Sequence, residues 1–248
     1  MLQNNIDKYK SISNIEQKLY EDFGLTPIIG VEIEFYIRDL MQNLPDYILK
    51  EEKGNQQFEI DIFPEQTFTK TIDKIAHVQT MLRMNQNVIM SPKPFIDDYG
   101  NAMHIHLNFL QNGILIFDSN YQLMEQIAQI LCHFLEEHFP IFAPTDEDYK
   151  RFDSKFMAPT HICFGGNNRT VAIRIPDKYP LRLEHRVPSN NINIYDAIYS
   201  ILYSIYYGLK NPKNISLHSK IHGNAWHEQY DLKPFPKTLV EARRRILS

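Results

Sequence analysis

Two glutamates stand two positions apart in the segment GVEIEFYI, residues 30–37. If this segment is a β-strand, Glu32 and Glu34 project from one face and the apolar residues between them project from the other. Their Cα atoms would lie roughly 6.6 Å apart, so repulsion between the two carboxylates costs stability unless a cation lies nearby. Taken alone, the segment is more typical of a solvated strand face than of a metal site.

Four more segments alternate between apolar and polar residues, namely 57–63, 102–109, 170–176 and 181–188. If all five strands join one sheet, its polar face carries a set of charged and imidazole side chains. These are Glu32, Glu34, Glu59, Asp61, His104, His106, Arg174, Arg182, Glu184 and Arg186. None of them is a lysine, although lysine is the usual partner of carboxylates on a solvated sheet face. This composition favours a binding site over a surface exposed only to water.

Arginine and histidine are the counter-charges on this face, and each suits a different ligand. The planar guanidinium of arginine matches the oxygens of phosphates and carboxylates, whereas carboxylates clustered with imidazole suit divalent cations. A pocket with both would accommodate a polyanion and metal ions, the combination that phosphoryl transfer needs. The chain has neither GxxxxGK(S/T) nor GxGxxG, and it has only 9 glycines, so arginine and metal would have to hold a phosphate.

The pair His104 and His106 is ambiguous by itself. A lone histidine on a strand is more often structural than a ligand, and H-x-H also occurs in metal-binding barrels that add a glutamate a few residues later. No glutamate follows His106 before Glu125. The barrel is therefore the weaker of the two metal-site interpretations.

Helical periodicity predicts four helices beside these strands. They span residues 13–23, 68–82, 122–137 and 194–209. Ser13 and Glu16 form a capping-box pattern at the start of the first helix, and Gly24 follows its last turn. Residues 39–57 have no clear pattern and are expected to form a loop. We therefore expect an α+β fold, in which an antiparallel sheet has a charged face and packs its apolar face against helices.

Composition narrows the class of protein. The 248 residues show no repeat or linker, so a single domain over residues 1–248 is predicted. A formal net charge of -4 without runs of lysine or arginine argues against a nucleic-acid partner. Residues 194–209 are too short and too rich in tyrosine to span a bilayer, and the amino terminus lacks a secretory signal. Cys132 and Cys163 have no CxxC spacing, which predicts reduced thiols in the cytoplasm.

With these residues in place, the chain resembles the catalytic domain of glutamine synthetase from about Leu25 to its end. Five ordered motifs carry the resemblance: GLTPIIGVEIEF, GNAMHIHLNF, APTDEDYKRF, NNRTVAIRIP, and RLEHRVP followed by NNINIYDAIYS. They match the family's first catalytic strand and its segments GxGMHxH, APxxNSYKRL, NRSAxxRIP and RxExRxPD. The resemblance implies small-molecule substrates, ATP and two Mg²⁺ or Mn²⁺ ions.

The resemblance also implies a role for individual residues. One metal ion would be held by Glu34, Glu52 and Glu59. The second, nearest the transferred phosphate, would be held by Glu32, His104 and Glu184. Glu52 is chosen over its neighbour Glu51 because EKGNQQFE has the spacing of the family's ExxPGQxE.

The remaining roles fall to arginines and one histidine. ATP would face His106, Arg174 and Arg182. The phosphoryl group in flight would be stabilised by Arg169 and Arg174. The carboxylates of a glutamate-like substrate would be bound by Arg151 and Arg186. In the reaction that this implies, a substrate carboxylate attacks the γ-phosphate, and an amine converts the resulting acyl phosphate to an amide.

Several departures from the family bear on the substrate. Met157 stands where the family has the glutamate that deprotonates ammonium, and Tyr99 replaces the asparagine that meets the amino group of glutamate. The stretch between Glu34 and Glu52 is far shorter. The chain begins almost at the catalytic domain, so the small amino-terminal β domain, which donates an ammonium-binding aspartate to the neighbouring subunit, is expected to be missing. The resemblance leaves a homo-oligomer open, but the family's double ring is not expected.

Two hypotheses follow from these departures. Loss of the base leaves acyl phosphate formation intact but should prevent the use of ammonium. The first hypothesis is a ligase that joins the γ-carboxyl of glutamate, or of a similar acid, to another amine, with Asp153 as a substitute base. The second is a nucleotide-binding or regulatory protein that keeps the metal site without completing turnover. We favour the ligase.

Overall fold

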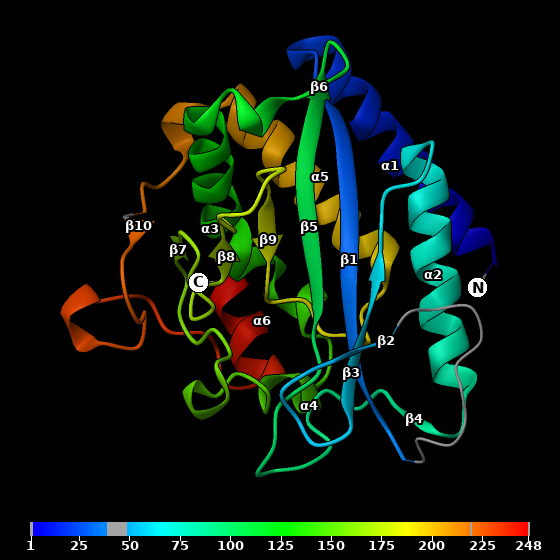
Figure 1. The fold of residues 1–248 in the computed structure, drawn as a ribbon. Helices are drawn as coiled ribbons and strands as arrows, with labels where there is room; N and C mark the ends of the chain where they lie inside the picture. Colours follow the sequence, from blue (N-terminus) through cyan, green and yellow to red (C-terminus); the bar gives the residue numbers. More distant parts are fainter. Residues whose placement is uncertain (1, 39–48, 219, 248) are drawn as a thin grey trace.

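One mixed sheet organises the part of the chain that the computed structural model describes, which is residues 2–38, 49–218 and 220–247. Its strand order is β10-β7-β8-β9-β5-β1-β3-β2, with β4 beside β1 and β6 beside β5. The strands are β1 (Thr26–Ile37), β2 (Leu49–Glu51), β3 (Gln57–Ile62), β4 (Val88–Ile89), β5 (Met103–Gln111), β6 (Ile114–Leu115), β7 (Phe164–Gly165), β8 (Ile173–Arg174), β9 (Leu183–His185) and β10 (Lys220–Ile221). Figure 1 shows β1 and β5 as the long central strands.

Helices lie behind these central strands in Figure 1. The α-helices are α1 (Leu2–Phe23), α2 (Phe68–Met84), α3 (Tyr121–Phe142), α4 (Asp146–Tyr149), α5 (Ile194–Lys210) and α6 (Leu239–Leu247). Short 3₁₀ helices are η1 (Ile116–Asp118), η2 (Ser154–Phe156), η3 (Pro212–Asn214) and η4 (Glu228–Tyr230). Because α1, α2 and α3 all contact α5, and α1 and α2 also contact β1, these helices form one layer over the sheet.

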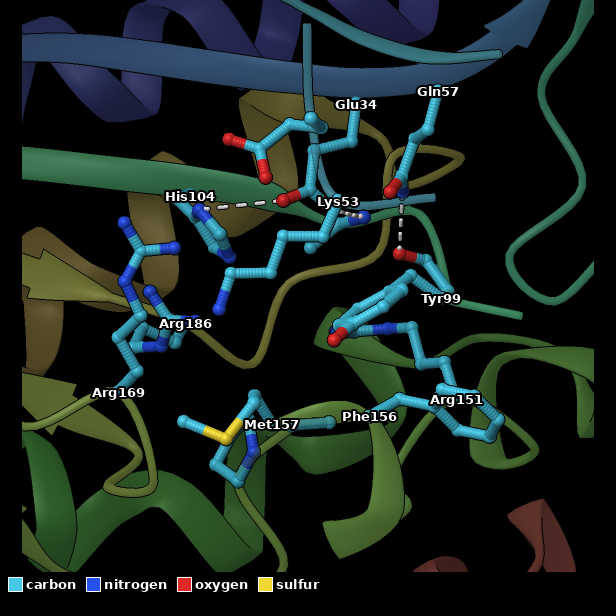
Figure 2. Close-up of a pocket in the computed structure, with 15 residues that line it drawn as sticks. Glu34, Lys53, Gln57, Tyr99, His104, Arg151, Phe156, Met157, Arg169 and Arg186 are labelled. Carbon is cyan, nitrogen blue, oxygen red and sulfur yellow. Dashed lines mark hydrogen bonds and ion pairs between the residues drawn. The ribbon is translucent and has the colours of Figure 1, made fainter. Parts of the chain in front are cut away.

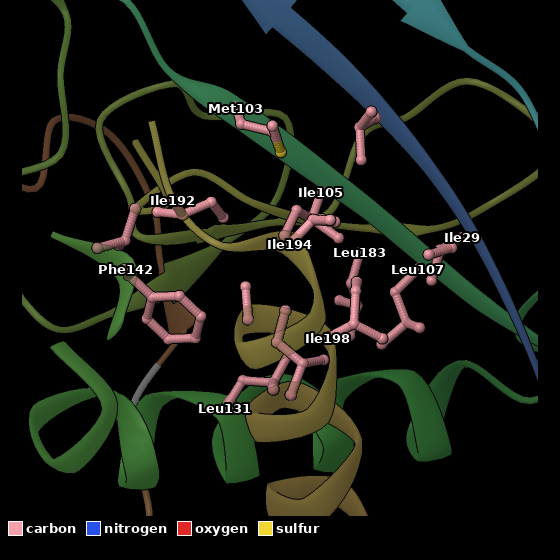
Figure 3. Close-up of a cluster of buried hydrophobic side chains, with 14 of the residues drawn as sticks. Ile29, Met103, Ile105, Leu107, Leu131, Phe142, Leu183, Ile192, Ile194 and Ile198 are labelled. Carbon is pink, nitrogen blue, oxygen red and sulfur yellow. The ribbon is translucent and has the colours of Figure 1, made fainter. Parts of the chain in front are cut away.

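The main hydrophobic core fills the space between this helical layer and the sheet. Every second residue of β1 and β5 points into it, including Ile33 and Ile105, which are almost fully buried. In Figure 3, side chains of β5 and β9 meet Ile198 of α5 and Leu131 of α3. The helices therefore hold the strands in place from one side and leave the opposite face to the polar residues.

Strand register decides which polar residues become neighbours on that opposite face. Glu32 on β1 lies opposite His104 on β5 and opposite Asp61 on β3. In the same antiparallel ladders, Glu34 pairs with Glu59, while His106 and Arg174 both pair with Glu184. The predicted α+β class, with a charged face opposite the helices, is confirmed. The pairing is antiparallel through the centre, and among the described strands only β7 pairs in parallel, with β8 and β10.

Several predicted boundaries were wrong. The first helix begins at Leu2 rather than near Ser13, because Ile12, Ile15 and Leu19 continue one buried stripe through the supposed cap. The strands predicted over 170–176 and 181–188 contain only two and three ladder residues. Proline at positions 176 and 188 has no N–H to donate, which limits both ladders.

The segment expected to be a loop, residues 39–57, contains β2 in its second half. Positions 39–48 lie outside the described residues. The third helix runs past its predicted end to Phe142, with Pro140 inside it. Among the helices of the described residues, none is long and apolar enough to cross a membrane.

Candidate active site

Three side chains from three different strands form the centre of the charged face. His104 Nδ1 lies 3.2 Å from Glu32 Oε2 and 3.6 Å from Glu184 Oε1. One ligand atom from each of the three residues lies within 4.8 Å of the others. His104 and Glu184 are buried and Glu32 is partly exposed, so an ion bound here would retain access to solvent. These are the residues expected to hold the second metal ion, and their donor atoms and spacing fit a divalent cation.

The other expected metal site is arranged differently. Glu34, Glu52 and Glu59 line the same cavity, but the compact second group of ligand atoms in the described residues belongs to Glu32, Glu59 and Asp61. The register places Asp61 directly opposite Glu32, whereas Glu52 follows β2 in a turn. Asp61 therefore joins the candidate ligands.

A lysine does reach the charged face, contrary to the composition expected for it. Lys50 of β2 forms an ion pair with Asp61, and its Nζ lies 3.6 Å from Glu59 Oε1. Lys50 was missed because it lies in the stretch expected to be a loop. Its alternation with Leu49 on a three-residue strand is too short a signal to assign a face.

Crowding of carboxylates has an electrostatic consequence at Glu59. Burial, together with the charges of Glu32, Glu52 and Asp61, raises the pKa of Glu59 to about 8. A divalent cation would relieve this repulsion, because it favours the ionised form of every carboxylate around it. The donor set thus fits metal ions on electrostatic grounds as well as by spacing.

Two arginines hold Glu184 in its ionised form. Arg174 Nη1 lies 2.6 Å from Glu184 Oε2, and Arg186 forms an ion pair with the other oxygen. Burial alone would raise the pKa of Glu184, but Arg186, His104, His106 and Arg174 together lower it to about 2. Glu184 is therefore anionic in a nearly solvent-free position.

The two imidazoles flank Glu32. Arg182 Nε donates a hydrogen bond to His106 Nδ1 at 3.1 Å, and His106 Nε2 lies 3.0 Å from Glu32 Oε1. Burial acts to raise the pKa of Glu32, but hydrogen bonds from His104 and His106 hold it below the ordinary range. This hydrogen bond places His106 and Arg182 at the same end of the site. Both residues were expected to face ATP.

Three cavities share walls around this centre. An apolar cleft beside Ile28, Phe63 and Leu181 and an acidic cavity both use Glu32 and Arg182 as lining residues. The other end of the acidic cavity adjoins a pocket under residues 156–159. We call this segment the flap and the pocket beneath it the flap pocket. The residues common to these two are Glu34, Glu52, His104, Arg169 and Arg186. The three cavities therefore adjoin one another, in a path from an apolar end, past the clustered carboxylates, to the flap pocket.

The flap pocket is small, with a cavity volume of about 50 Å³, and is shown in Figure 2. Arg151 and Arg186, both buried, line it, while Arg169 reaches it from an exposed position. Burial lowers the pKa of Arg151 to about 10, and its guanidinium donates to the carbonyl of Val187. The two cations expected to bind substrate carboxylates thus line one cavity.

Two residues that depart from the family line this pocket, Met157 on the flap segment and Tyr99 on the loop between β4 and β5. Met157 ends η2 with φ of 59° and lines the pocket with Phe156 and Tyr99. Asp153 does not line the pocket; its carboxylate accepts a hydrogen bond from the backbone of Lys155 at 2.9 Å and so caps η2. Its position gives no support to the role of substitute base.

Sequence reasoning also missed two lining residues that come from a tight turn. Lys53 follows Glu52 and reaches into the flap pocket (Figure 2). Gln57 is buried and donates to Gly100 O and Asn101 Oδ1, at 3.0 and 3.1 Å, which ties this turn to the loop that carries Tyr99. Both residues lie inside EKGNQQFE, so the motif that identified Glu52 was the available signal.

Comparison with known proteins identifies the family to which this chain belongs. The family model described as glutamine synthetase, catalytic domain, matches residues 42–247. The chain belongs to this family. Among curated relatives, gamma-glutamylputrescine synthetase PuuA of Escherichia coli (strain K12) is 24% identical over 90% of the chain and 59% of its own length. Glutamate–methylamine ligase of Methyloversatilis universalis is 29% identical over 79% of the chain and 49% of its own length.

Solved structures agree on the fold of this family member. GmaS in complex with ADP matches with a TM-score of 0.80 and 21% identity, over 97% of the chain and 67% of that protein. GmaS without ligand gives a TM-score of 0.78. The chain spans about half the length of these curated relatives, 59% of gamma-glutamylputrescine synthetase PuuA and 49% of glutamate–methylamine ligase.

Proposed function

We propose that this protein is an ATP- and divalent-metal-dependent carboxylate–amine ligase, which uses an amine other than ammonia. The observation that carries the proposal is the convergence of Glu32, His104 and Glu184 within 4.8 Å, beside the buried Arg186. Clustered anionic ligands next to guanidinium groups suit a metal-bound polyphosphate, and family membership directs this chemistry to acyl phosphate formation.

Each part of the path has a role in the proposed reaction. The apolar cleft would take the base of ATP, with His106 and Arg182 at the boundary where its phosphates meet the acidic cavity. Glu32, His104 and Glu184 would hold one Mg²⁺ or Mn²⁺ ion. Glu59 and Asp61, with Glu34 and Glu52 on the same wall, would hold the other. The bound ions would supply positive charge that neutralises the γ-phosphate.

The arginines would complete the site from the flap side. Arg151 and Arg186 would bind the carboxylates of glutamate or a similar acid. Arg169 and Arg174, which both line the acidic cavity, would stabilise the charge of the phosphoryl group as the substrate carboxylate attacks it. Arg151 and Arg186 are held by burial and Arg174 by its ion pair with Glu184, so little reorganisation of these three side chains would be needed at the moment of transfer.

Two relatives support the choice of amine. Their names, gamma-glutamylputrescine synthetase and glutamate–methylamine ligase, both describe joining glutamate to an organic amine. The flap pocket of the present chain has Met157, an apolar residue, at its wall. We place the reaction in the cytoplasm, with small molecules as partners, because ATP is abundant there and both cysteines are free and buried.

Incubation of the pure protein with ATP, Mg²⁺, glutamate and hydroxylamine tests the ligase. We expect ADP and γ-glutamyl hydroxamate, and His104→Asn should lower their rate by at least about 100-fold because it removes a metal ligand. His133→Asn, on the outer part of α3, is the matched control. Nucleotide binding without turnover across a panel of acids and amines would favour the alternative, a regulatory protein that keeps the metal site.

A further inference from the structure

Positive charge dominates the flap pocket. Its lining carboxylates are those of Glu34 and Glu52, on the wall shared with the acidic cavity. Glu34 already accepts the backbone N–H of Ala102 at 2.7 Å. The lining cations outnumber these carboxylates two to one and belong to Lys53, Arg151, Arg169 and Arg186. Metal ions bound at the acidic wall would add positive charge, and the carboxylates and phosphate of the bound substrates would offset part of the total, so the pocket has no excess of negative charge to attract a protonated amine.

The wall opposite the acidic residues is apolar and aromatic. Figure 2 places Met157 and Phe156 across the pocket from Glu34 and His104. The ring of Tyr99 meets that of Phe156 edge-on, with centroids 5.6 Å apart. None of the described lining residues on this wall carries a carboxylate, since the nearby Asp153 caps η2 instead. This side therefore has no anionic group to bind an ammonium ion or take its proton.

We propose that the acceptor is an arylamine, which binds as its uncharged free base with the ring against Tyr99, Phe156 and Met157. The inference rests on the ligase function proposed above. Aromatic and thioether groups pack favourably on an aromatic ring. Basicity decides the class: an alkylamine with the basicity of lysine is neutral in only ~0.04% of molecules at pH 7, whereas a weakly basic arylamine is almost wholly neutral.

The proposed step needs no base on the flap. The amine nitrogen forms a bond to the acyl carbon of the γ-glutamyl phosphate, the bond from that carbon to the phosphate oxygen breaks, and phosphate leaves with the electron pair. The nitrogen then loses a single proton, which the departing phosphate or water accepts. An ammonium ion would have to lose an additional proton before attack, and this pocket offers no carboxylate on the flap side to remove it.

Aniline and cyclohexylamine, two rings of similar size and different basicity, test the proposal. Amide and ADP formation are measured with ATP, Mg²⁺ and glutamate, at equal total amine. We expect kcat/KM at pH 7 to be at least about tenfold higher for aniline. The ratio should fall about tenfold for each pH unit up to pH 9, since only the alkylamine gains free base over that range. Because both amines react with the same protein, the ratio of their kcat/KM values is unaffected by ionisation of the protein's own groups.

Variants at position 157 test whether the flap wall of the pocket determines the preference for aniline over cyclohexylamine. Met157→Glu places a carboxylate on the flap wall and should raise kcat/KM for cyclohexylamine relative to aniline by about tenfold. Met157→Gln has nearly the same shape without the charge and should leave the ratio unchanged. Equal responses of the two variants would overturn the assignment of selectivity to the flap wall.

Other outcomes separate this inference from the function on which it rests. Preference of the native protein for ammonium or cyclohexylamine at pH 7 would overturn the arylamine alone. Formation of hydroxamate with hydroxylamine, without any amide from aniline, would also overturn the arylamine proposal alone. Absence of both ADP and hydroxamate with hydroxylamine would overturn the ligase itself, and the arylamine with it.

Discussion

The two faces of the central sheet are built from the same strands and have opposite energetic requirements. Ile33 is fully buried under the helices, while its neighbour Glu32 lies beside His104 on the other face. Apolar burial stabilises the helix-covered face by roughly 25 cal/mol per Å² removed from water. The charged face brings together groups that repel one another or require partners, and desolvation opposes their pairing. The comparison teaches that one face supplies the stability that the other needs.

Removal of the most buried carboxylate of the charged face, Glu184, is expected to have the largest effect. Glu184→Gln leaves Arg174 and Arg186 without their anionic partner in a buried site, so the free energy of unfolding should fall by about 3–5 kcal/mol. Urea unfolding measures this, and hydroxamate formation should also disappear. Glu65→Gln, which breaks an exposed ion pair with Lys74, should cost less than about 1 kcal/mol. Equal stability of the two variants would contradict a charged face held by buried pairing.

A truncation on the helix-covered face should separate stability from chemistry. Ile105 stands between His104 and His106 but points into the core, where it is 1% exposed. Ile105→Ala should lower the free energy of unfolding by about 2–5 kcal/mol through lost burial and a cavity. Hydroxamate formation per folded molecule should stay near the native level at low temperature. Ile114→Ala, at an exposed position, provides the control, with a change within about 0.5 kcal/mol.

Gly100 tests how the flap pocket depends on backbone packing. A Cβ there would lie 2.6 Å from Arg151 Cβ and 2.9 Å from Pro92 O, so Gly100→Ala must displace Arg151 or its loop. We expect a loss of about 1–3 kcal/mol in stability and a raised KM for the acid substrate. Gly166→Ala is the matched control, because a Cβ at that position meets nothing within 4 Å. A raised KM for ATP alone would show that Arg151 serves a different substrate.

The smallest predicted effect is a pH dependence on the helix-covered face. His138 is buried between α3 and α5 with its Nδ1 3.1 Å from Ser204 Oγ, and burial lowers its pKa. The unfolded chain then takes up a proton below about pH 6.5 that the folded protein resists, so stability is present above that pH and declines as pH falls. His138→Asn should make this decline shallower in urea unfolding between pH 8 and 5. An unchanged slope would assign the acid sensitivity to other groups.

Prediction from sequence succeeded best where the chain is most regular. Alternation along β1 and β5 placed Glu32, Glu34 and His104 on one face, and the structure brings these side chains together. It was weaker in the short ladders of β8 and β9, where the predicted strands were several residues too long. Each ladder ends before a proline, whereas the alternation of apolar and polar residues along the sequence runs on to Pro176 and Pro188.

The sequence by itself determined the fold class, the side chains of the charged face and the family, because alternation and motif spacing are properties of neighbouring residues along the chain. Tertiary structure decided which of those groups became partners. Register placed Asp61 rather than Glu52 in the compact acidic group, and β2 brought Lys50 to it. The flap pocket also arises only on folding, since its walls come from separate loops. Distances between such segments depend on the packing of the whole chain, which no local pattern encodes.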